Sequence, residues 1–204
     1  MNRISSKDGR PVRTHPAASR THKGFSMVEL LVVVGIILAV SAISFPTVTR
    51  SVRVYRLSGT AANVAGTLQL ARLNAVRLNR STPPLAWRLR VQGNQNIVWV
   101  DLNNNGAPEA TEPQQMFSAD IQFLPAGTAP SVASMGYANT QISPAAVAFD
   151  SRGAVSFGAA APVVYVFVLG YANRPQEGFT AVSLMPTGKT QQWRAAANSP
   201  WQKR

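Results

Sequence analysis

The chain of 204 residues contains no cysteine, only two histidines and only eight acidic residues. The absence of cysteine excludes disulfide bonds, thiol nucleophiles and thiolate metal sites, so a folded domain must draw its stability from packing. His15 and His22 both lie near the N-terminus, so the chain beyond residue 24 has no imidazole for acid–base catalysis. No phosphate-binding glycine loop and no recognisable acid–base pair is present either, and the composition therefore argues against an enzyme.

The scarcity of acidic residues makes the chain strongly basic, with 20 Lys and Arg and a formal net charge of +12. Residues 1–24 hold six of the cations and only Asp8 as an anion, so this segment carries +5 and the remaining chain +7. Hydrophobic residues make up 46% of the sequence. These values fit one domain of modest size together with an apolar segment.

A long apolar run follows the basic segment directly, from Phe25 to Phe45. A bilayer core needs about 20 apolar helical residues, whereas the apolar part of a secretory signal has only about 7–15, so the run predicts a membrane span. Pro46 follows the run in place of the small residues of a signal-peptidase site. We therefore expect a processing signal before the span. Because Lys- and Arg-rich flanks stay in the cytoplasm, we expect the chain after Pro46 to lie outside it.

One carboxylate, Glu29, lies inside this apolar run. A carboxylate in a membrane segment costs about 2.5–3.5 kcal/mol on insertion scales and indicates a functional site that needs a partner. Cleavage after Gly24 would create an ammonium at Phe25, which the Glu29 carboxylate of the same or a neighbouring subunit could neutralise. Such a pair would set the register between subunits more than it would add stability. The alternative is a plain membrane anchor with a stray glutamate.

The segment from Lys23 to Glu29 resembles the type IV prepilin motif, in which a dedicated peptidase cuts after the glycine and methylates the new amino terminus. In that family the fifth residue of the mature chain is a glutamate, which is Glu29 here, and a proline is common near the position of Pro46. The resemblance implies a leader of residues 1–24, a filament-core helix of residues 25–46, and prepilin peptidase as a processing partner. It also implies assembly with other pilins or pseudopilins, and an inner-membrane anchor with a periplasmic globular domain.

The chain after Pro46 predicts an amphipathic helix over residues 47–82 and a β-rich domain over residues 83–204. Pro84 favours a helix end, because it pushes the preceding residue out of the helical region. Three arginines near the start of this helix fit either a solvated face or contact with headgroups or a neighbouring subunit: Arg50, Arg53 and Arg56. Apolar residues spaced by three and four predict the buried face: Val48, Val52, Tyr55, Val64, Leu68, Ala71, Ala75 and Leu78.

Short apolar or alternating runs separated by turn residues predict strands in the second part of the chain. A helix followed by many short strands is an α+β arrangement, here a long helix packed on an antiparallel sheet. The Pro-rich stretch 125–144 is expected to be a surface loop or a mobile insert. The predicted strands are residues 85–91, 96–101, 119–124, 147–150, 154–157, 163–169 and 180–184.

Within the prepilin class, the chain is most similar to the GspH/FimT family of minor pilins and pseudopilins. The similarity rests on residues 70–77, 99–106 and 149–155, and it implies the type IV pilin fold. It implies a minor pseudopilin of a type II secretion system or a minor pilin of a type IV pilus, located at or near the filament tip. Secretion, twitching and DNA uptake remain alternatives. The late strand has Pro186 and Lys189 where the family carries a Gly-Arg-x-Arg signature.

A loop after the second predicted strand has the spacing of a calcium-binding loop, in which oxygen ligands surround a sharp glycine turn. Two prolines within and after the loop disfavour the helix that an EF-hand requires there, and Asn-Asn-Gly is a common turn sequence. We interpret the loop as a structural hairpin, with calcium as the alternative and no other cofactor expected. The matching residues are Asp101, Asn103, Asn105, Gly106 and Glu112.

The C-terminal region combines cations with aromatic residues, which favours a second hypothesis. Lys and Arg supply sequence-independent affinity for phosphates, and tryptophan can stack on bases, so DNA is a candidate partner. A loosely packed basic tail is the alternative, since a basic patch is a nonspecific signal. The candidate residues are Lys189, Arg194, Lys203 and Arg204, with Trp193 and Trp201 as stacking faces.

Overall fold

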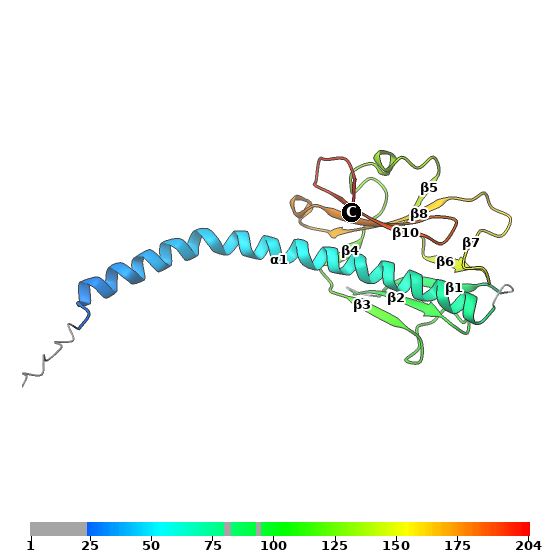
Figure 1. Ribbon diagram of the computed structural model, residues 1–204, viewed down its shortest axis with the longest axis horizontal. Coiled ribbons are helices and arrows are strands. Elements are labelled where there is room, and N and C mark those ends of the chain that lie inside the picture. Colours follow the sequence, from blue (N-terminus) through cyan, green and yellow to red (C-terminus); the bar gives the residue numbers. More distant parts are fainter. Residues whose placement is uncertain (1–23, 80–82, 93–94) are drawn as a thin grey trace, which may run out of the picture. The chain divides into compact units, whose positions relative to one another are not determined.

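The computed structural model describes residues 24–79, 83–92 and 95–204. The predicted leader therefore lies outside the described residues, except for Gly24. The chain divides into two compact units, Met1–Ser44 and Phe45–Arg204, each described by itself below. One helix, α1 (Met27–Arg77), belongs to both units and contains Pro46 (Figure 1).

In the first unit, α1 is apolar and all of its residues up to Ser44 are exposed. Large side chains such as Leu31, Ile36 and Ile43 are 72%, 59% and 77% exposed. By length and composition, α1 can cross a membrane. Apolar surface of this extent is stabilised only by a nonaqueous partner, either lipid or another apolar helix.

In the second unit, which we call the head, one face of α1 is buried against the sheets. Of the predicted face, Val64, Leu68, Ala71 and Ala75 are confirmed and are fully buried. The prediction was wrong for the other positions, because the core begins only at Leu57 and Leu78 lies beyond the end of α1. The predicted but exposed residues are Val48, Val52, Tyr55 and Leu78, and the buried residues that the prediction missed are Leu57, Ala61 and Ala65.

The helix ends at Arg77, earlier than the predicted residue 82. Asn79 has a φ of +48°, and the N–H groups of Leu78 and Asn79 donate to the Asn74 and Val76 carbonyls at 2.8 and 3.1 Å. Asparagine tolerates the left-handed conformation that commonly stops a helix. The helix therefore stops before the prolines that were expected to end it.

The head contains two sheets. The first has the order β3-β2-β1-β6-β7, and every neighbouring pair in it is antiparallel. Its strands are β1 (Leu85–Gln92), β2 (Gln95–Asp101), β3 (Gln114–Phe117), β6 (Ala146–Phe149) and β7 (Val155–Ser156). In register, Trp87 of β1 lies opposite Val100 of β2 and Val147 of β6, which places their side chains on one face.

The second sheet has the order β11-β10-β9-β8-β4, antiparallel throughout, and β5 pairs in parallel with β8. Its strands are β4 (Ile121–Phe123), β5 (Thr140–Ile142), β8 (Val164–Tyr171), β9 (Phe179–Leu184), β10 (Thr190–Ala195) and β11 (Gln202–Lys203). The predicted strands are present with shifted ends, whereas β3, β5, β10 and β11 were not predicted. The α+β class, a long helix packed on antiparallel sheets, is confirmed.

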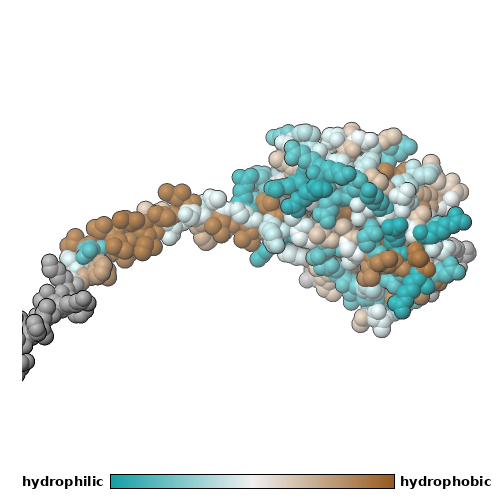
Figure 2. Space-filling view, in the orientation of Figure 1, coloured by the Kyte–Doolittle hydropathy of each residue, from teal (hydrophilic) through white to brown (hydrophobic). Residues whose placement is uncertain are grey.

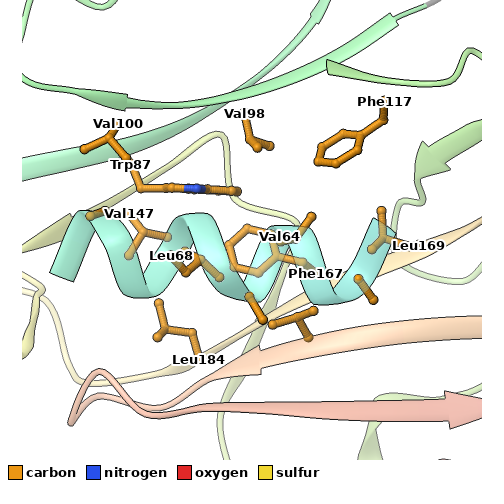
Figure 3. Close-up of a cluster of buried hydrophobic side chains, with 14 of the residues drawn as sticks. Val64, Leu68, Trp87, Val98, Val100, Phe117, Val147, Phe167, Leu169 and Leu184 are labelled. Atoms are coloured by element: carbon orange, nitrogen blue, oxygen red, sulfur yellow. The ribbon is translucent and has the colours of Figure 1, made fainter. Parts of the chain in front are cut away.

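The main core lies where α1 meets both sheets (Figure 3). Trp87 from the first sheet and Phe167 from the second pack edge to face, with ring centroids 4.8 Å apart. Trp87 also donates from Nε1 to the Thr67 hydroxyl on α1 at 3.2 Å. Val64 and Leu68 supply the helix side of this core. Burial of these side chains, at about 1.5–3 kcal/mol each, fixes α1 against both sheets.

The stretch 125–144 is largely exposed and irregular, as the surface-loop prediction stated, but it is packed on the second sheet as a strap. It contains the short helix η1 (Val132–Met135) as well as β5, and Met135 is buried in a second hydrophobic cluster. Tyr137 on the strap lies 3.0 Å from the buried Ser183 hydroxyl. Aromatic residues from the C-terminal segment complete this cluster and hold the strap to the second sheet.

Candidate functional site

The predicted processing segment lies at the start of α1. Gly24, Phe25 and Ser26 are exposed and nonhelical, and α1 begins at Met27. The Gly24–Phe25 peptide bond thus lies outside regular secondary structure and is exposed, so that a peptidase can reach it. Phe25 is 75% exposed.

Glu29 lies in the first turn of α1 and is exposed. A carboxylate is favourable there, because the N-terminal end of a helix carries partial positive charge. Within the described part of the chain Glu29 has no ion-pair partner. The geometry thus leaves its carboxylate available to a charge from outside the helix.

Gln69 and Arg72 on α1 form a junction with the β6–β7 turn of the first sheet and the β9–β10 turn of the second. Arg72 on α1 donates from Nε to the Gly153 carbonyl in the β6–β7 turn, at 3.0 Å. Asp150 closes that turn, because its Oδ1 accepts from the N–H groups of Arg152 and Ala154, both at 2.9 Å. Gln69 donates to the Gly188 carbonyl in the β9–β10 turn at 3.0 Å. These hydrogen bonds hold α1 to the two turns, and we call this contact between Gln69, Arg72, Gly153 and Gly188 the joint.

The predicted calcium ligands lie in the loop between β2 and β3, but their oxygens already accept hydrogen bonds. Asp101 is fully buried, and its carboxylate accepts from Arg88 Nε and from the backbone N–H groups of Asn105 and Gly106, the latter two at 3.1 and 2.9 Å. Glu112 accepts from the N–H group of Leu102 at 2.7 Å. Both acidic side chains thus hold the loop's own backbone.

The two asparagines of this loop form local turns. The side-chain oxygen of Asn103 accepts from the N–H of Asn105 at 3.1 Å, and that of Asn105 accepts from the N–H of Ala107 at 2.8 Å. Among the described residues, no group of three or more His, Cys, Asp or Glu side chains could hold a metal ion. The donor set therefore fits a self-contained hairpin loop better than a cation cage.

The predicted basic residues gather at the β10–β11 edge of the second sheet. Lys189 precedes β10, Arg194 lies in it, and Arg204 continues the ladder beyond β11 by donating its backbone N–H to Gln192 at 3.0 Å. Lys189, Lys203 and Arg204 line one hollow, and Arg194 and Arg204 line another. Figure 2 shows hydrophilic side chains gathered over this region.

The predicted stacking role of the two tryptophans is wrong. Trp193 and Trp201 are only 8% and 4% exposed and belong to the second hydrophobic cluster. Their Nε1 atoms donate to the Ser183 hydroxyl and the Pro130 carbonyl at 2.9 and 3.0 Å. The two tryptophans are thus packed in the head, whereas Arg194, Lys203 and Arg204 are exposed.

One cluster was missed by the sequence reasoning. Arg53 on α1 pairs with Glu177, at 2.8 Å from Nη2 and 2.9 Å from Nε to the Oε1 atom. Glu177 ends the short helix η2 (Pro175–Glu177), and Arg50 donates to the Gln176 carbonyl at 3.2 Å. Two of the three arginines considered earlier are therefore committed to the head. Arg53 and Glu177 are 124 residues apart in the sequence, so no local sequence pattern predicts that they pair.

Tyr171 adds to the same cluster by donating from its hydroxyl to the Arg53 carbonyl at 2.9 Å. Burial is the main cause that raises the pKa of Tyr171 above its ordinary value, and the carboxylates of Asp120 and Glu177 raise it further while Arg56 and Arg53 lower it. Burial likewise raises the pKa of Tyr165. Both hydroxyls thus stay protonated at neutral pH.

Residues 19–45 match the prokaryotic N-terminal methylation motif. This motif is the processing signal of type IV pilin-like prepilins, so it indicates a type IV pilin-like or pseudopilin protein, a class of structural subunits. It implies processing by prepilin peptidase and assembly with other pilins or pseudopilins. The comparisons with curated proteins and with solved structures found no significant match.

Proposed function

We propose that this protein is a minor pseudopilin of a type II secretion system, a structural subunit that assembles at or near the tip of the filament. The observation that carries the proposal is the position of Glu29, in the first turn of an apolar helix inside the methylation motif. A folded head with two sheets and a helix is a scaffold for contacts between subunits. The residue resemblance to the GspH/FimT family supports the minor role.

The mechanism is assembly. Cleavage after Gly24 frees the amine of Phe25, which is methylated, and the Glu29 carboxylate of this or an adjoining subunit neutralises it. The exposed apolar face of α1 then exchanges lipid for the helices of other subunits. Because an unpaired buried charge costs about 3–5 kcal/mol, the pair favours one register of assembly. The leader stays in the cytoplasm and the head lies in the periplasm.

The processing step is tested with a Gly24→Ala variant of the full chain, expressed together with prepilin peptidase. Intact-mass measurement of the membrane fraction should show a methylated chain that begins at Phe25 for the natural sequence and an uncut chain for the variant. Equal cleavage of both chains would remove the proposed cut site. Capture of the processed chain, followed by identification of its partners, should yield other pseudopilins.

A second candidate function, a DNA-binding minor pilin for uptake, is favoured by one observation. Lys189, Arg194, Lys203 and Arg204 gather at one sheet edge, where they offer phosphate contacts. The full chain in detergent should then retard DNA at low salt, with retardation lost as salt rises. The double variant Lys189→Ala/Arg194→Ala should weaken it, whereas Arg174→Ala, an exposed arginine elsewhere, should not. No retardation at low salt would exclude this function.

A further inference from the structure

A cavity of about 490 Å³ lies in the head, between α1, the short helix η2 and the end of β10. Its volume falls within the range of about 300–1,000 Å³ that is typical of small-molecule sites. Its walls combine apolar groups with charged side chains. The charged residues in the walls are Arg50, Glu177, Arg194 and Arg204.

The three walls of this cavity are held together by specific contacts. Arg53 on α1 pairs with Glu177 of η2, at 2.8 Å from Nη2 to Oε1. Gly178, which follows η2, has a φ of +86°, and a Cβ there would be 2.8 Å from the Ala195 carbonyl oxygen of β10. Only glycine fits such a close approach with a positive φ. The cavity is therefore formed before any ligand binds, as is usual for ligand sites.

Positive charge dominates the walls. Glu177 is the one acidic side chain among the described residues that line the cavity, but it is 4% exposed and Arg53 neutralises it. The side chain of Arg50 is 65% exposed, and Arg194 and Arg204 are exposed as well. A ligand in this cavity thus meets three guanidinium groups and no accessible carboxylate.

These guanidinium groups keep most of their donors free. Arg50 uses Nη2 for a hydrogen bond of 3.2 Å to the Gln176 carbonyl, and its Nε lies 3.7 Å from Glu177. Neither the Arg194 nor the Arg204 side chain has an ion-pair partner in the part of the chain that the structure describes. Cations that line one cavity repel one another, and an anion between them replaces this repulsion with attraction. The cavity therefore favours an anion.

The number of guanidinium groups restricts the type of anion. A carboxylate carries a single charge on two oxygens, which is too little to neutralise three guanidinium groups. A terminal phosphate carries about −1.5 to −2 charge at neutral pH and three strong acceptor oxygens. Guanidinium groups match these oxygens with paired hydrogen bonds. A terminal phosphate thus fits the charge of the cavity better than a carboxylate does.

The cavity has room for more than a phosphate. The remaining walls include the apolar side chain of Val54, the ring of Tyr55 and the methyl groups of Ala195 and Ala196. These groups offer contact to an apolar or flat part of a ligand. The ligand that fits is therefore a phosphate joined to such a part.

We propose that this cavity binds a small phosphate monoester. Its phosphate contacts Arg50, Arg194 and Arg204, and the rest of the molecule lies against Val54 and the Tyr55 ring. The bound molecule bridges α1 and β10 and so stabilises the head. This goes beyond the assembly role proposed above, because it requires neither the methylation motif nor a filament.

The test is a thermal-shift titration of the full chain, in detergent and buffer without phosphate and at constant ionic strength. The probes are phenyl phosphate, inorganic phosphate, dimethyl phosphate and acetate. Concentrations up to about 5 mM avoid the general stabilisation that concentrated phosphate gives to folded proteins. We expect a saturable rise in melting temperature with phenyl phosphate and no effect of acetate. Dimethyl phosphate, with a single charge and two free oxygens, should bind about tenfold more weakly than phenyl phosphate.

Three results would overturn the proposal. One is the absence of a saturable rise with phenyl phosphate. Another is equal binding of dimethyl phosphate, which would indicate a site for phosphate diesters, the groups found in lipids and nucleic acids. The third is tighter binding of inorganic phosphate than of phenyl phosphate, which would indicate a free-phosphate site.

Two variants assign the binding to this cavity. Arg194→Gln removes an exposed guanidinium and should weaken phenyl phosphate by about tenfold or more, the effect of one charge-assisted hydrogen bond. The matched control is Lys189→Gln/Lys203→Gln, which removes two exposed cations from the other hollow and none from the cavity. It should change the affinity by less than about twofold, since salt screens exposed charges. Unchanged binding in Arg194→Gln, or equal weakening in the control, would overturn the proposal.

The outcome is separable from both candidate functions. Glu29→Ala should leave the binding of phenyl phosphate unchanged, because this binding requires no assembly. If phenyl phosphate does not bind while Glu29→Ala still blocks filament incorporation, or while the chain still retards DNA, the cavity site alone is excluded.

Discussion

The Nε atom of Arg72 on α1 lies 3.0 Å from the carbonyl oxygen of Gly153 and donates a hydrogen bond to it. Gly188 lies against the same pair: a Cβ at Gly188 would overlap the Gly153 carbonyl oxygen and approach Arg72 Nε to 2.9 Å. The helix and the ends of β7 and β9 are thus held together at one point where no side chain fits at position 188.

Gly188→Ala should therefore destabilise the head. The φ of Gly188 is +79°, which costs about 1–2 kcal/mol for alanine, and the overlap with Gly153 adds to that strain. We expect a loss of about 2–4 kcal/mol, seen as a lower melting temperature of the full chain in detergent. The matched control is Gly127→Ala, with a φ of +88° and open space at the Cβ position, which should lose only about 1 kcal/mol. Equal losses for the two variants would contradict the joint.

Gly66→Ala should stabilise the chain. Gly66 is an exposed residue in the interior of α1, and a Cβ there would meet no atom within 4 Å. Alanine restricts the unfolded chain more than glycine does, so a gain of about 0.5–1 kcal/mol is expected in thermal unfolding. A lower melting temperature would mean that Gly66 makes a close contact within the fold.

The stability of the head should decline above pH 10 through Tyr171. Burial raises its pKa above 10.0, so the folded state holds this proton more tightly than the unfolded state. The contribution is fully present below pH 10 and is lost as the pH rises through the pKa of the folded state. Tyr171→Phe should cost about 1 kcal/mol at neutral pH, because it removes the hydrogen bond to Arg53.

The control for that prediction is the slope of stability against pH. Tyr171→Phe should give a shallower decline above pH 10 than the natural chain, with Tyr165, whose pKa is also raised, accounting for part of the remainder. Chemical denaturation at several pH values measures both curves. Parallel curves would show that Tyr171 does not titrate differently in the folded and unfolded states.

Calcium should leave the melting temperature unchanged. The Asp101 and Glu112 oxygens already accept hydrogen bonds from backbone N–H groups and Arg88, so an ion would have to displace them. A ligand that binds only the folded state raises stability by RT ln(1 + [L]/Kd), which makes a thermal-shift titration sensitive. A rise with millimolar calcium, absent in Asp101→Asn, would establish the metal site instead.

Elements whose apolar residues recur at a regular spacing along the chain were predictable from the sequence. The apolar run and Glu29 stand out by composition alone, and the strands around Trp87 and Phe167 were found because their apolar residues are contiguous or alternate. The buried face of α1 was half predicted, since Val64 and Leu68 follow the helical spacing. The same spacing continued through Val52 and Tyr55, where the core does not reach.

Features that depend on distant contacts were not predictable. The pair of Arg53 and Glu177 joins positions 124 residues apart, and no sequence pattern near either residue predicts the pairing. Strand β10 is rich in Gln and Thr, so it lacks the apolar pattern that predicts a strand. Its strand conformation depends on hydrogen bonding with β9. The strap was predicted as a surface loop, but its packing was not predicted, since its Pro and Ser content hides the contact of Tyr137 with Ser183 and of the Pro130 carbonyl with Trp201.

The central claim is that Glu29 acts in assembly and not in folding or insertion. The most direct measurement is the fraction of the full chain recovered in assembled filaments, for the natural sequence and for Glu29→Ala. Membrane insertion and cleavage after Gly24 should be unchanged in the variant, while its incorporation should fall by about tenfold or more, because the Phe25 ammonium would be left unpaired. Normal incorporation of Glu29→Ala would contradict the account.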